Sequence, residues 1–356
     1  MTAPYHPVKI YFELTRYCNF HCDFCPIRVS HRENQHMDFA LYQRGIDDIA
    51  AHRLTPTVGF HVLGEPMLSP HLYEAIVYAR SRGLSTEMST NGSMLTPANT
   101  RRLIEAGLDS LAISVQVLDE DEHRSRGSSL TFAEYYQRIL AALRQIRRAG
   151  SPMQLTLCFM NKASLRLFEL DHPMRLADER RADRQKLTRY ILDIAAAIDQ
   201  PLEAKAVEAA LRRMNLTLPR TLNIGEQTRV YVQPFADWGN AFNRRTVRPA
   251  RYGSCNYALN NLGVLADGSI TLCCADYDGH TALGNLNNTL LSEVLSSAQV
   301  WQVKRGFEQG RVLHPHCQHC LGASSPARVW LKSLVSLYLF RVSKFQPARV
   351  REMKLA

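Results

Sequence analysis

Three cysteines lie close together near the start of the chain, in the stretch YCNFHCDFCPIR. Cys18, Cys22 and Cys25 have the spacing C-x3-C-x2-C. Cysteine thiolates bind zinc and iron–sulfur clusters, and a closed structural zinc site takes four ligands. A set of three therefore either recruits another ligand, such as His21 or His31, or leaves one metal coordination position open for a substrate or cofactor.

A second set of four cysteines stands in the last third of the chain and consists of Cys255, Cys273, Cys317 and Cys320. Four thiolates close the coordination of a zinc ion or of an iron–sulfur cluster. Cys274 follows Cys273 directly and competes with it for one ligand position. The spacing from the glycine of the DGSITLCC run favours Cys273 as the ligand.

The elements that must position these cysteines alternate between short β-rich runs and helical patterns. Repeated strand–helix units predict a parallel α/β sheet, and five or six of them predict a full or partial (β/α) barrel with its chemistry at the C-terminal strand ends. We expect strands at 8–15, 57–64, 84–90, 109–116, 153–160 and 228–235, and helices at 38–52, 70–82, 96–106 and 131–148.

The pattern changes after about residue 240, where a hairpin is expected around 262–273 and an amphipathic helix at 289–308. We therefore predict a partial (β/α)6 barrel at 1–240 with a charged helical insert at about 161–225, which forms either surface helices or a substrate lid. A small cysteine-organised domain at 241–325 follows it. A basic amphipathic helical tail at 326–356 either docks on the barrel or contacts an anionic membrane.

The composition is that of an ordinary globular protein, with 356 residues, 46% hydrophobic and 21% charged. We find no run of about 18 uncharged apolar residues and no secretory signal, so we expect a cytoplasmic location. Clustered cysteines in such a reducing compartment indicate metal sites before disulfides. The net charge of +10 comes without a nucleic-acid-binding motif, so we expect no nucleic-acid partner.

The first cysteine set resembles that of radical S-adenosylmethionine (SAM) enzymes, in which C-x3-C-x2-C follows strand one with an aromatic residue, here Phe24, before the third cysteine. The run LGEP at the end of strand two is similar to the family's GGEP motif, with leucine in place of the first glycine. The resemblance implies that Gly64, Glu65 and Pro66 hold the amino group of the cofactor's methionine moiety.

The runs STNG and ISVQ end the next two expected strands and resemble the family's further cofactor-facing segments, which makes Ser114, Asn91 and Arg126 candidate SAM contacts. The resemblance covers residues 8–160. It implies a [4Fe–4S] cluster on three cysteines, with SAM at the open iron. It also implies a 5′-deoxyadenosyl radical that removes hydrogen from an unactivated carbon.

The second cysteine set resembles the SPASM/twitch domains that follow the barrel in many of these enzymes. No cysteine follows Cys320, so the chain resembles the shorter twitch form, with one auxiliary [4Fe–4S] cluster for electron transfer. The spacing is similar to that of twitch dehydrogenases of aminocyclitol antibiotic pathways. A zinc site with four cysteines is the alternative.

Further candidates lie in strands or follow strand ends. Cys274 and Cys158 are candidate hydrogen-atom donors, with a buried structural thiol as the alternative reading of each. The candidate substrate contacts are Glu13, His61, Gln233, Asp237, Trp238 and Asn240.

The leading functional hypothesis is dehydrogenation of a small sugar- or cyclitol-like alcohol, with the auxiliary cluster as electron acceptor and a flavodoxin or ferredoxin as reductant. A radical epimerase with a cysteine hydrogen donor and a peptide maturase are the alternatives. A protein whose clusters are only structural is a further alternative, since fold-level analogy does not fix function.

Overall fold

A computed structural model of the chain describes residues 3–161, 181–214, 219–235, 237–243, 246–339 and 352–354. The chain forms two compact units: unit 1 contains Met1–Cys18, Pro26–Thr86 and Asp237–Gln346, and unit 2 contains Asn19–Cys25, Glu87–Ala236 and Pro347–Ala356. Parts of the expected insert (161–225) and of the expected tail (326–356) lie outside the described residues.

Unit 1 contains strands in the order β10-β9-β8-β1-β2. β1 pairs in parallel with β2 on one side and with β8 on the other, so residues beyond 240 share a sheet with the first strand. β8, β9 and β10 are antiparallel neighbours, which confirms the expected hairpin. The strands are β1 (Lys9–Phe12), β2 (Thr57–Phe60), β8 (Asn261–Val264), β9 (Ser269–Thr271) and β10 (Ala282–Asn285). The domain boundaries at 240 and 325 stay predictions.

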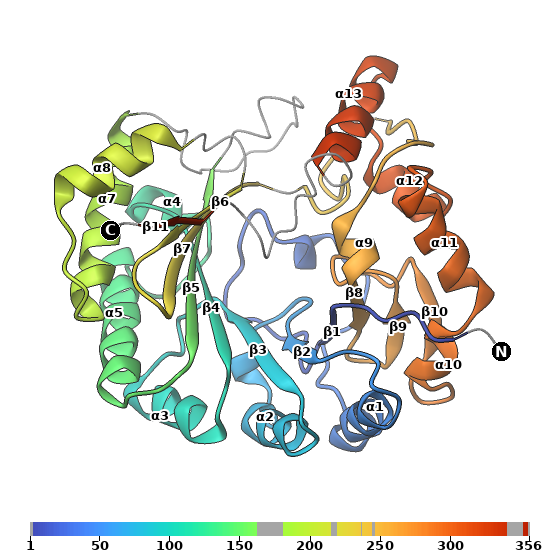
Figure 1. Cartoon of the computed structure of the whole chain (residues 1–356), viewed down its shortest axis with the longest axis horizontal. Helices are drawn as coiled ribbons and strands as arrows, with labels where there is room; N and C mark the ends of the chain where they lie inside the picture. The colour runs from blue at the N-terminus through green and yellow to red at the C-terminus, as the bar shows by residue number, and fades with distance from the viewer. Residues whose placement is uncertain are drawn as a thin grey trace. The chain divides into compact units, whose positions relative to one another are not determined.

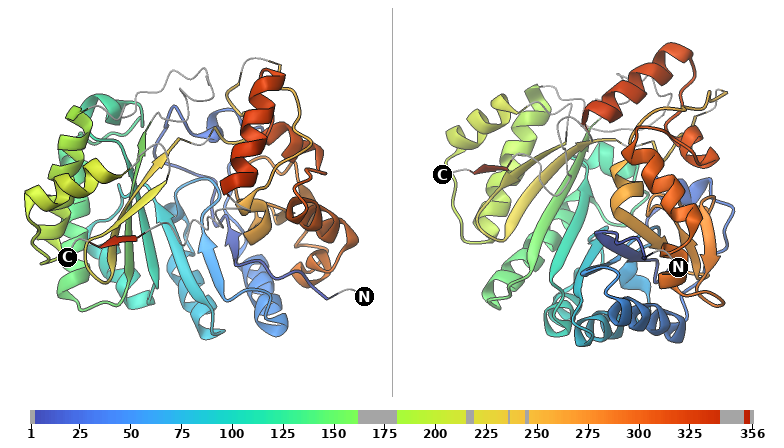
Figure 2. Two further views of the ribbon diagram at one scale, coloured as in Figure 1. Left: turned by 45° about the horizontal axis from the view of Figure 1, so that its top comes forward. Right: turned by 45° about the vertical axis from the view of Figure 1, so that its right-hand side comes forward.

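Several helices of unit 1 begin where a side chain accepts a hydrogen bond from one of the first backbone N–H groups. Asp38 accepts a hydrogen bond from the Leu41 N–H at 3.0 Å and so caps α1. Figures 1 and 2 show α9, α10 and α11 beside β8, β9 and β10. The helices are α1 (Phe39–His52), α2 (Leu72–Ser81), α9 (Asn256–Asn260), α10 (Leu291–Leu295), α11 (Ala298–Glu308), α12 (Pro315–Cys320) and α13 (Pro326–Leu337), with 3-10 turns at Pro26–Arg28 and Pro66–Leu68.

Unit 2 contains strands in the order β3-β4-β5-β7-β6-β11, and β3, β4, β5 and β7 pair in parallel. Side chains alternate between its two faces. Ile113 and Leu157 are fully buried on one face, whereas Ser114, Cys158 and Tyr231 stand in register on the other. The strands are β3 (Ser85–Thr90), β4 (Ser110–Gln116), β5 (Gln154–Asn161), β6 (Arg220–Asn223), β7 (Thr228–Pro234) and β11 (Glu352–Lys354).

The helices of unit 2 line one side of its strands, where Figure 2 shows α5, α7 and α8 together. α5 begins with a capping box, in which Thr131 and Glu134 each accept a hydrogen bond from the other's backbone N–H. The helices are α3 (Pro97–Ala106), α4 (Glu120–Arg124), α5 (Phe132–Arg148), α7 (Arg181–Ala197) and α8 (Ala204–Arg213). The repeated strand–helix units with parallel pairing confirm the predicted α/β class.

The single helix expected at 289–308 is wrong, because the chain forms α10 and α11 with a break between them. Ser296 turns its hydroxyl back to the Ser292 carbonyl oxygen at 2.7 Å, and Ser297 caps α11 by accepting from the Val300 N–H at 3.3 Å. Serine side chains compete for backbone groups in this way, which favours helix ends over helix interiors.

The sequence-based expectation also missed β6, a strand inside the segment predicted to be helical. β6 pairs antiparallel with β7, from Arg220 opposite Val232 to Asn223 opposite Arg229. So short a strand depends on its partner rather than on its own β-propensity. No helix in the described part of the chain is long and apolar enough to cross a bilayer.

Candidate functional site

The three N-terminal cysteines are reduced, and all nine cysteines lie among the described residues without forming a disulfide. Cys18 belongs to unit 1, and Cys22 and Cys25 belong to unit 2, where the Cys25 N–H donates to the Cys22 carbonyl oxygen at 3.1 Å. Phe24, between the last two, is 7% exposed. The loop thus offers three thiols within one short stretch of chain.

Arg126 is a fully buried cation beside Cys22 in unit 2. Its guanidinium donates to the Val115 carbonyl oxygen at 2.8 Å and to the Tyr135 hydroxyl at 2.9 Å, and lies 4.7 Å from the Phe20 ring centroid. The Cys22 thiol donates to the Arg126 carbonyl oxygen at 3.7 Å. Burial raises the pKa of Cys22, and the positive charge of Arg126 opposes that shift. Arg126 therefore favours the thiolate that a metal needs.

Replacing Arg126 with methionine is expected to lower both iron retention at the first cysteine set and the stability of the fold. The change leaves the Val115 carbonyl and the Tyr135 hydroxyl without their buried donor, which costs about 1–3 kcal/mol for each group. Iron analysis and urea unfolding measure the two effects. Arg124→Met is the matched control, because Arg124 is exposed and pairs only with Asp121 on the surface. Equal losses in both variants would contradict the role of Arg126.

The LGEP turn of unit 1 has a geometry that only glycine accommodates. Gly64 has φ +74°, and a Cβ there would lie 2.3 Å from the Thr15 carbonyl oxygen. The Glu65 N–H donates to the Tyr17 carbonyl oxygen at 2.8 Å, so the turn is fastened to the chain just before Cys18. Glu65 is 1% exposed, and its carboxylate accepts from the Met67 N–H at 3.2 Å while Pro66 opens the 3-10 turn.

Asn91 and Ser114 lie in unit 2, at the ends of β3 and β4. The Asn91 amide nitrogen donates to the Asn19 side-chain oxygen at 2.9 Å, and its oxygen accepts from the Ser93 hydroxyl at 2.7 Å. The Ser114 hydroxyl lies 3.4 Å from that of Ser89. Asn91 thus ties the end of β3 to the residue after Cys18.

The second cysteine set surrounds one cavity in unit 1. Cys255, Cys273, Cys317 and Cys320 all line this cavity. Burial raises the pKa of Cys255 to about 12, and burial also raises the pKa of Cys317 and of Cys320. The thiols also lie close enough to raise one another's pKa. Among the described residues, no three His, Cys, Asp or Glu side chains are arranged around a single metal ion.

Cys273 and Cys274 differ in their surroundings. Cys273 lines the cavity and its sulfur accepts from the Ala275 N–H at 3.3 Å, whereas the sulfur of Cys274 accepts from the Asn261 amide at 3.6 Å. A hydrogen bond with Cys274 and burial raise the pKa of Cys273. The assignment of Cys273 as ligand stays a prediction, and these contacts favour it.

The segment 237–240, predicted to contact substrate, packs against the C-terminal cysteine pair. Trp238 lines the cavity, and the Asn240 amide donates to the carbonyl oxygens of His319, Cys320 and Gly322 at 2.7, 3.2 and 3.1 Å. Asp237 pairs with Lys332 at 3.5 Å. A substrate role for these residues stays a prediction. The Asn240 contacts fasten the C-terminal end of α12, which carries Cys320.

Glu13 is bound on all sides in unit 1. Its carboxylate pairs with Arg32 at 2.5 Å and accepts from the backbone N–H groups of Leu63 and Ala266 at 3.3 and 3.0 Å. Arg32 also donates to the Tyr277 carbonyl oxygen at 3.2 Å. Sequence reasoning missed Arg32, although an arginine soon after the cysteine loop is a candidate partner for a buried glutamate. The Glu13–Arg32 pair therefore links the end of β1 to the LGEP turn and to the backbone at Ala266 and Tyr277.

The remaining candidates are spread over both units. His61 follows β2, and its ring contacts Tyr11 edge-on with 6.3 Å between centroids. Gln233 lies in β7. Burial raises the pKa of Cys158 to about 12, so its thiol stays protonated at neutral pH, as a hydrogen-atom donor requires.

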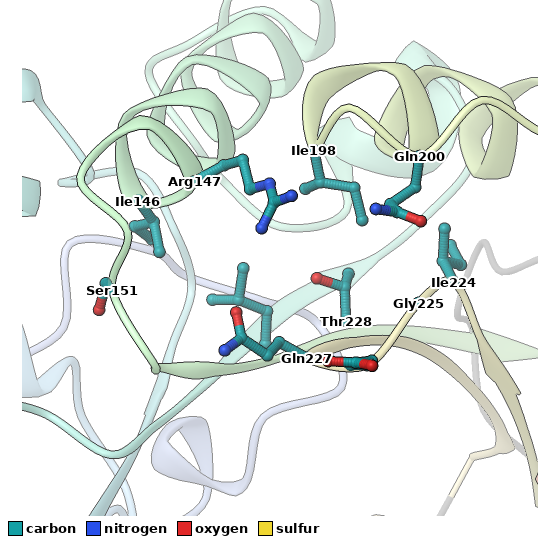
Figure 3. A pocket seen from close by; sticks show the side chains of 11 residues that line it. Ile146, Arg147, Ser151, Ile198, Gln200, Ile224, Gly225, Gln227 and Thr228 are labelled. Carbon is teal, nitrogen blue, oxygen red and sulfur yellow. The ribbon is translucent and has the colours of Figure 1, made fainter.

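A cavity of about 240 Å³ in unit 2 contains none of the predicted site residues (Figure 3). It lies where β5 and β7 begin. Arg147, Ile198 and Gln200 face Gln227 and Thr228 across it, and Ile146 and Ile224 lie at its two sides. The cavity is therefore at the opposite end of the parallel strands of unit 2 from Asn91 and Ser114, which lie where β3 and β4 end.

Comparison with protein families matches residues 12–165 to the radical SAM superfamily and residues 255–321 to SPASM, an iron–sulfur cluster-binding domain. The chain carries a radical SAM domain followed by a SPASM domain. The first match contains the cysteine loop and the LGEP turn, and the second contains all four cavity cysteines. This confirms the resemblance that the two cysteine sets predicted.

Three curated proteins that are similar to part of this chain carry different names. They are the tungsten-containing aldehyde ferredoxin oxidoreductase cofactor-modifying protein of Pyrococcus furiosus (30% identity), the AdoMet-dependent heme synthase of Nitratidesulfovibrio vulgaris (30%) and the PqqA peptide cyclase of Gluconobacter oxydans (33%). The matches span 31%, 41% and 44% of this chain, and only 31%, 39% and 42% of the relatives.

Solved structures with a similar fold include BtrN in complex with AdoMet and 2-DOIA, at 17% identity and a TM-score of 0.50 over 87% of this chain and 89% of BtrN. Streptococcus suis SuiB bound to S-adenosylmethionine has 12% identity and a TM-score of 0.54 over 84% of this chain and 68% of SuiB. These likenesses confirm the fold of radical SAM proteins.

The radical SAM domain implies SAM and a [4Fe–4S] cluster, and the SPASM domain implies auxiliary iron–sulfur ligation. The residues present fit these groups. Three thiols stand in the cysteine loop, and four line a single cavity of unit 1. Gly64 lets the LGEP turn approach the backbone just before Cys18, where any Cβ would clash with the Thr15 carbonyl oxygen.

Proposed function

We propose that this chain is a radical SAM oxidoreductase that dehydrogenates a small sugar- or cyclitol-like alcohol. When it is bound to the open iron of a [4Fe–4S] cluster and reduced by one electron, SAM supplies a 5′-deoxyadenosyl radical. Cys18, Cys22 and Cys25 would hold the other three irons of that cluster, and Gly64, Glu65 and Pro66 would hold the methionine end of SAM. Phe24, Asn91, Ser114 and Arg126 would shape the rest of its site.

The observation that carries the proposal is the cavity with four cysteines, because four thiolates leave an auxiliary cluster no open position for substrate. Such a cluster supplies an electron acceptor. Oxidation of an alcohol to a ketone then balances: one hydrogen atom leaves the carbon for the 5′-deoxyadenosyl radical, one proton leaves the hydroxyl, and one electron goes to the acceptor. A flavodoxin or ferredoxin would supply the electron that reduces SAM.

The experiment is an anaerobic incubation with dithionite, SAM and candidate alcohols deuterated at the carbinol carbon. We expect deuterium in 5′-deoxyadenosine and an equal amount of ketone. The Cys255→Ala variant is expected to form 5′-deoxyadenosine and to lose the ketone, because the first cysteine set is unchanged. Absence of 5′-deoxyadenosine from protein in which Cys18, Cys22 and Cys25 all hold iron would contradict an enzymatic role.

Two alternatives give different results in the same assay. A radical epimerase would form a product of unchanged oxidation state that carries one hydrogen from solvent. The variant Cys158→Ala or Cys274→Ala would then lack the thiol that donates this hydrogen atom and would not form the product. The buried, protonated thiol of Cys158 favours this alternative. A peptide maturase would transfer deuterium only from a peptide. The names of the PqqA cyclase relatives and the structure of SuiB bound to precursor peptide SuiA favour that alternative.

Two predictions about location are separate from the chemistry. A cytoplasmic location stays a prediction. Contact of the C-terminal helix with an anionic membrane also stays a prediction. The described part of that helix exposes Trp330, Leu334 and Tyr338, one turn apart from one another, while residues 340–351 lie outside the described part of the chain.

A further inference from the structure

Lys304 is a buried lysine that no step of the proposed reaction uses. It lies in α11, has no exposed surface, and donates its ammonium to the carbonyl oxygen of Ala258 in α9. The same ammonium lies 4.8 Å from the centroid of the Tyr5 ring. No described carboxylate forms an ion pair with it. Its side chain has no surface exposed to bulk solvent, the usual partner of a lysine.

The cavity with four cysteines lies next to this ammonium in unit 1. Ala258, which accepts its hydrogen bond, lines the cavity, and so does Phe307 in the next turn of α11. Burial lowers the pKa of Lys304 to about 8, and the charges of Cys273, Cys255 and Cys317 act to raise it. The cavity cysteines, once deprotonated, are therefore negative charges that act on the lysine.

A buried charge without a partner of opposite sign is costly, so the fold must supply one. The four thiolates of the cavity carry that negative charge when they hold an iron–sulfur cluster. We propose that Lys304 is the counter-ion of the auxiliary cluster and raises its reduction potential.

The direction follows from Coulomb's law. Reduction makes the assembly of cluster and thiolates one unit more negative, so a nearby fixed positive charge stabilises the reduced form more than the oxidised form. The effect is strong where solvent is excluded, as around Lys304. Net charge and burial are among the factors that set the potentials of iron–sulfur clusters. A higher reduction potential would make the auxiliary cluster a better electron acceptor. Only this last point rests on the proposed function.

The test is a redox titration of the reconstituted full-length protein, followed by electron paramagnetic resonance without substrate. The signal that does not change when SAM is added belongs to the auxiliary cluster. Lys304→Met keeps most of the side-chain length and removes the charge. We expect a shift to lower potential equal to at least about a tenfold change in the reduction equilibrium, or about 59 mV for one electron.

Two further variants separate charge from hydrogen bonding. Lys304→Gln keeps an N–H donor for the Ala258 carbonyl and is expected to lower the potential as Lys304→Met does. Arg305→Met removes a neighbouring exposed charge on the same helix and is expected to leave the potential unchanged, because water screens it. An unchanged potential in both Lys304 variants would overturn the inference. Lys304 would then have only a structural role, through its hydrogen bond to the Ala258 carbonyl in α9.

Loss of the auxiliary cluster from Lys304→Met would also be decisive when Lys304→Arg is measured beside it. Retention of the cluster by the arginine variant alone would show that positive charge is what the site needs. Loss from all the Lys304 variants would show a requirement for lysine's shape and would overturn the inference. The titration uses no substrate, so its outcome is independent of whether the alcohol oxidation occurs.

Discussion

Replacing Cys22 with alanine is expected to abolish formation of 5′-deoxyadenosine and to lower the iron content by one [4Fe–4S] cluster. Three thiolates are the fewest that leave one iron open while holding the rest, so two cannot keep the cluster in place. Even partners of metal ligands change metal affinity by about 10–100-fold when they are mutated. Loss of a ligand is therefore expected to lower the rate by more than about 100-fold.

The measurements are iron and sulfide analysis of the reconstituted protein and chromatography of the SAM cleavage products. Glu33→Ala is the control, because Glu33 is exposed in the loop that follows the cysteines. The auxiliary cluster is expected to remain in the Cys22 variant, since its four cysteines line a separate cavity. Full iron content with undiminished 5′-deoxyadenosine in Cys22→Ala would contradict the assignment of the first cysteine set.

Much of this arrangement could be predicted because it depends on local sequence. The cysteine spacing, the LGEP turn and the order of strands and helices are short-range patterns, and each was expected before the structure was known. The caps of α1 and α5 show why, since Asp38 and Thr131 fix their helix starts through hydrogen bonds three residues away. Local rules of this kind operate without knowledge of the tertiary fold.

Other features depend on contacts between distant residues, and sequence reasoning missed them. β6 forms because β7 offers it a partner. Asn240 is a polar residue at a strand end, as a substrate contact would be. Its amide nitrogen instead donates to the carbonyl oxygens of residues about 80 positions later in the chain. The position of Lys304 can be recognised in the sequence. It lies among Val300, Val303 and Phe307 on the apolar face of the predicted helix, where a lysine is either buried with the apolar side chains or interrupts the apolar face.

Replacing Gly64 with alanine is expected to weaken SAM binding by at least about tenfold, which corresponds to about 1.4 kcal/mol. The new Cβ would lie 2.3 Å from the Thr15 carbonyl oxygen and 2.9 Å from the Tyr17 carbonyl oxygen. Both contacts are with backbone, which cannot turn away as a flexible side chain can. The turn must therefore move away from β1, and Glu65 must move with it. Equilibrium dialysis of SAM against the reconstituted protein measures the effect.

Gly83→Ala is the matched control, because it separates backbone strain from steric clash. Gly83 has φ +79°, close to the +74° of Gly64, but a Cβ there would meet nothing within 4 Å. In both alanine variants the left-handed backbone conformation of a non-glycine residue therefore lowers the free energy of unfolding by about 1–2 kcal/mol. Only Gly64→Ala adds the clash at the cofactor turn. If both variants bind SAM equally well, the LGEP turn does not hold the cofactor. If Gly64→Ala alone fails, the close approach of the turn to Thr15 and Tyr17 is what forms that part of the site.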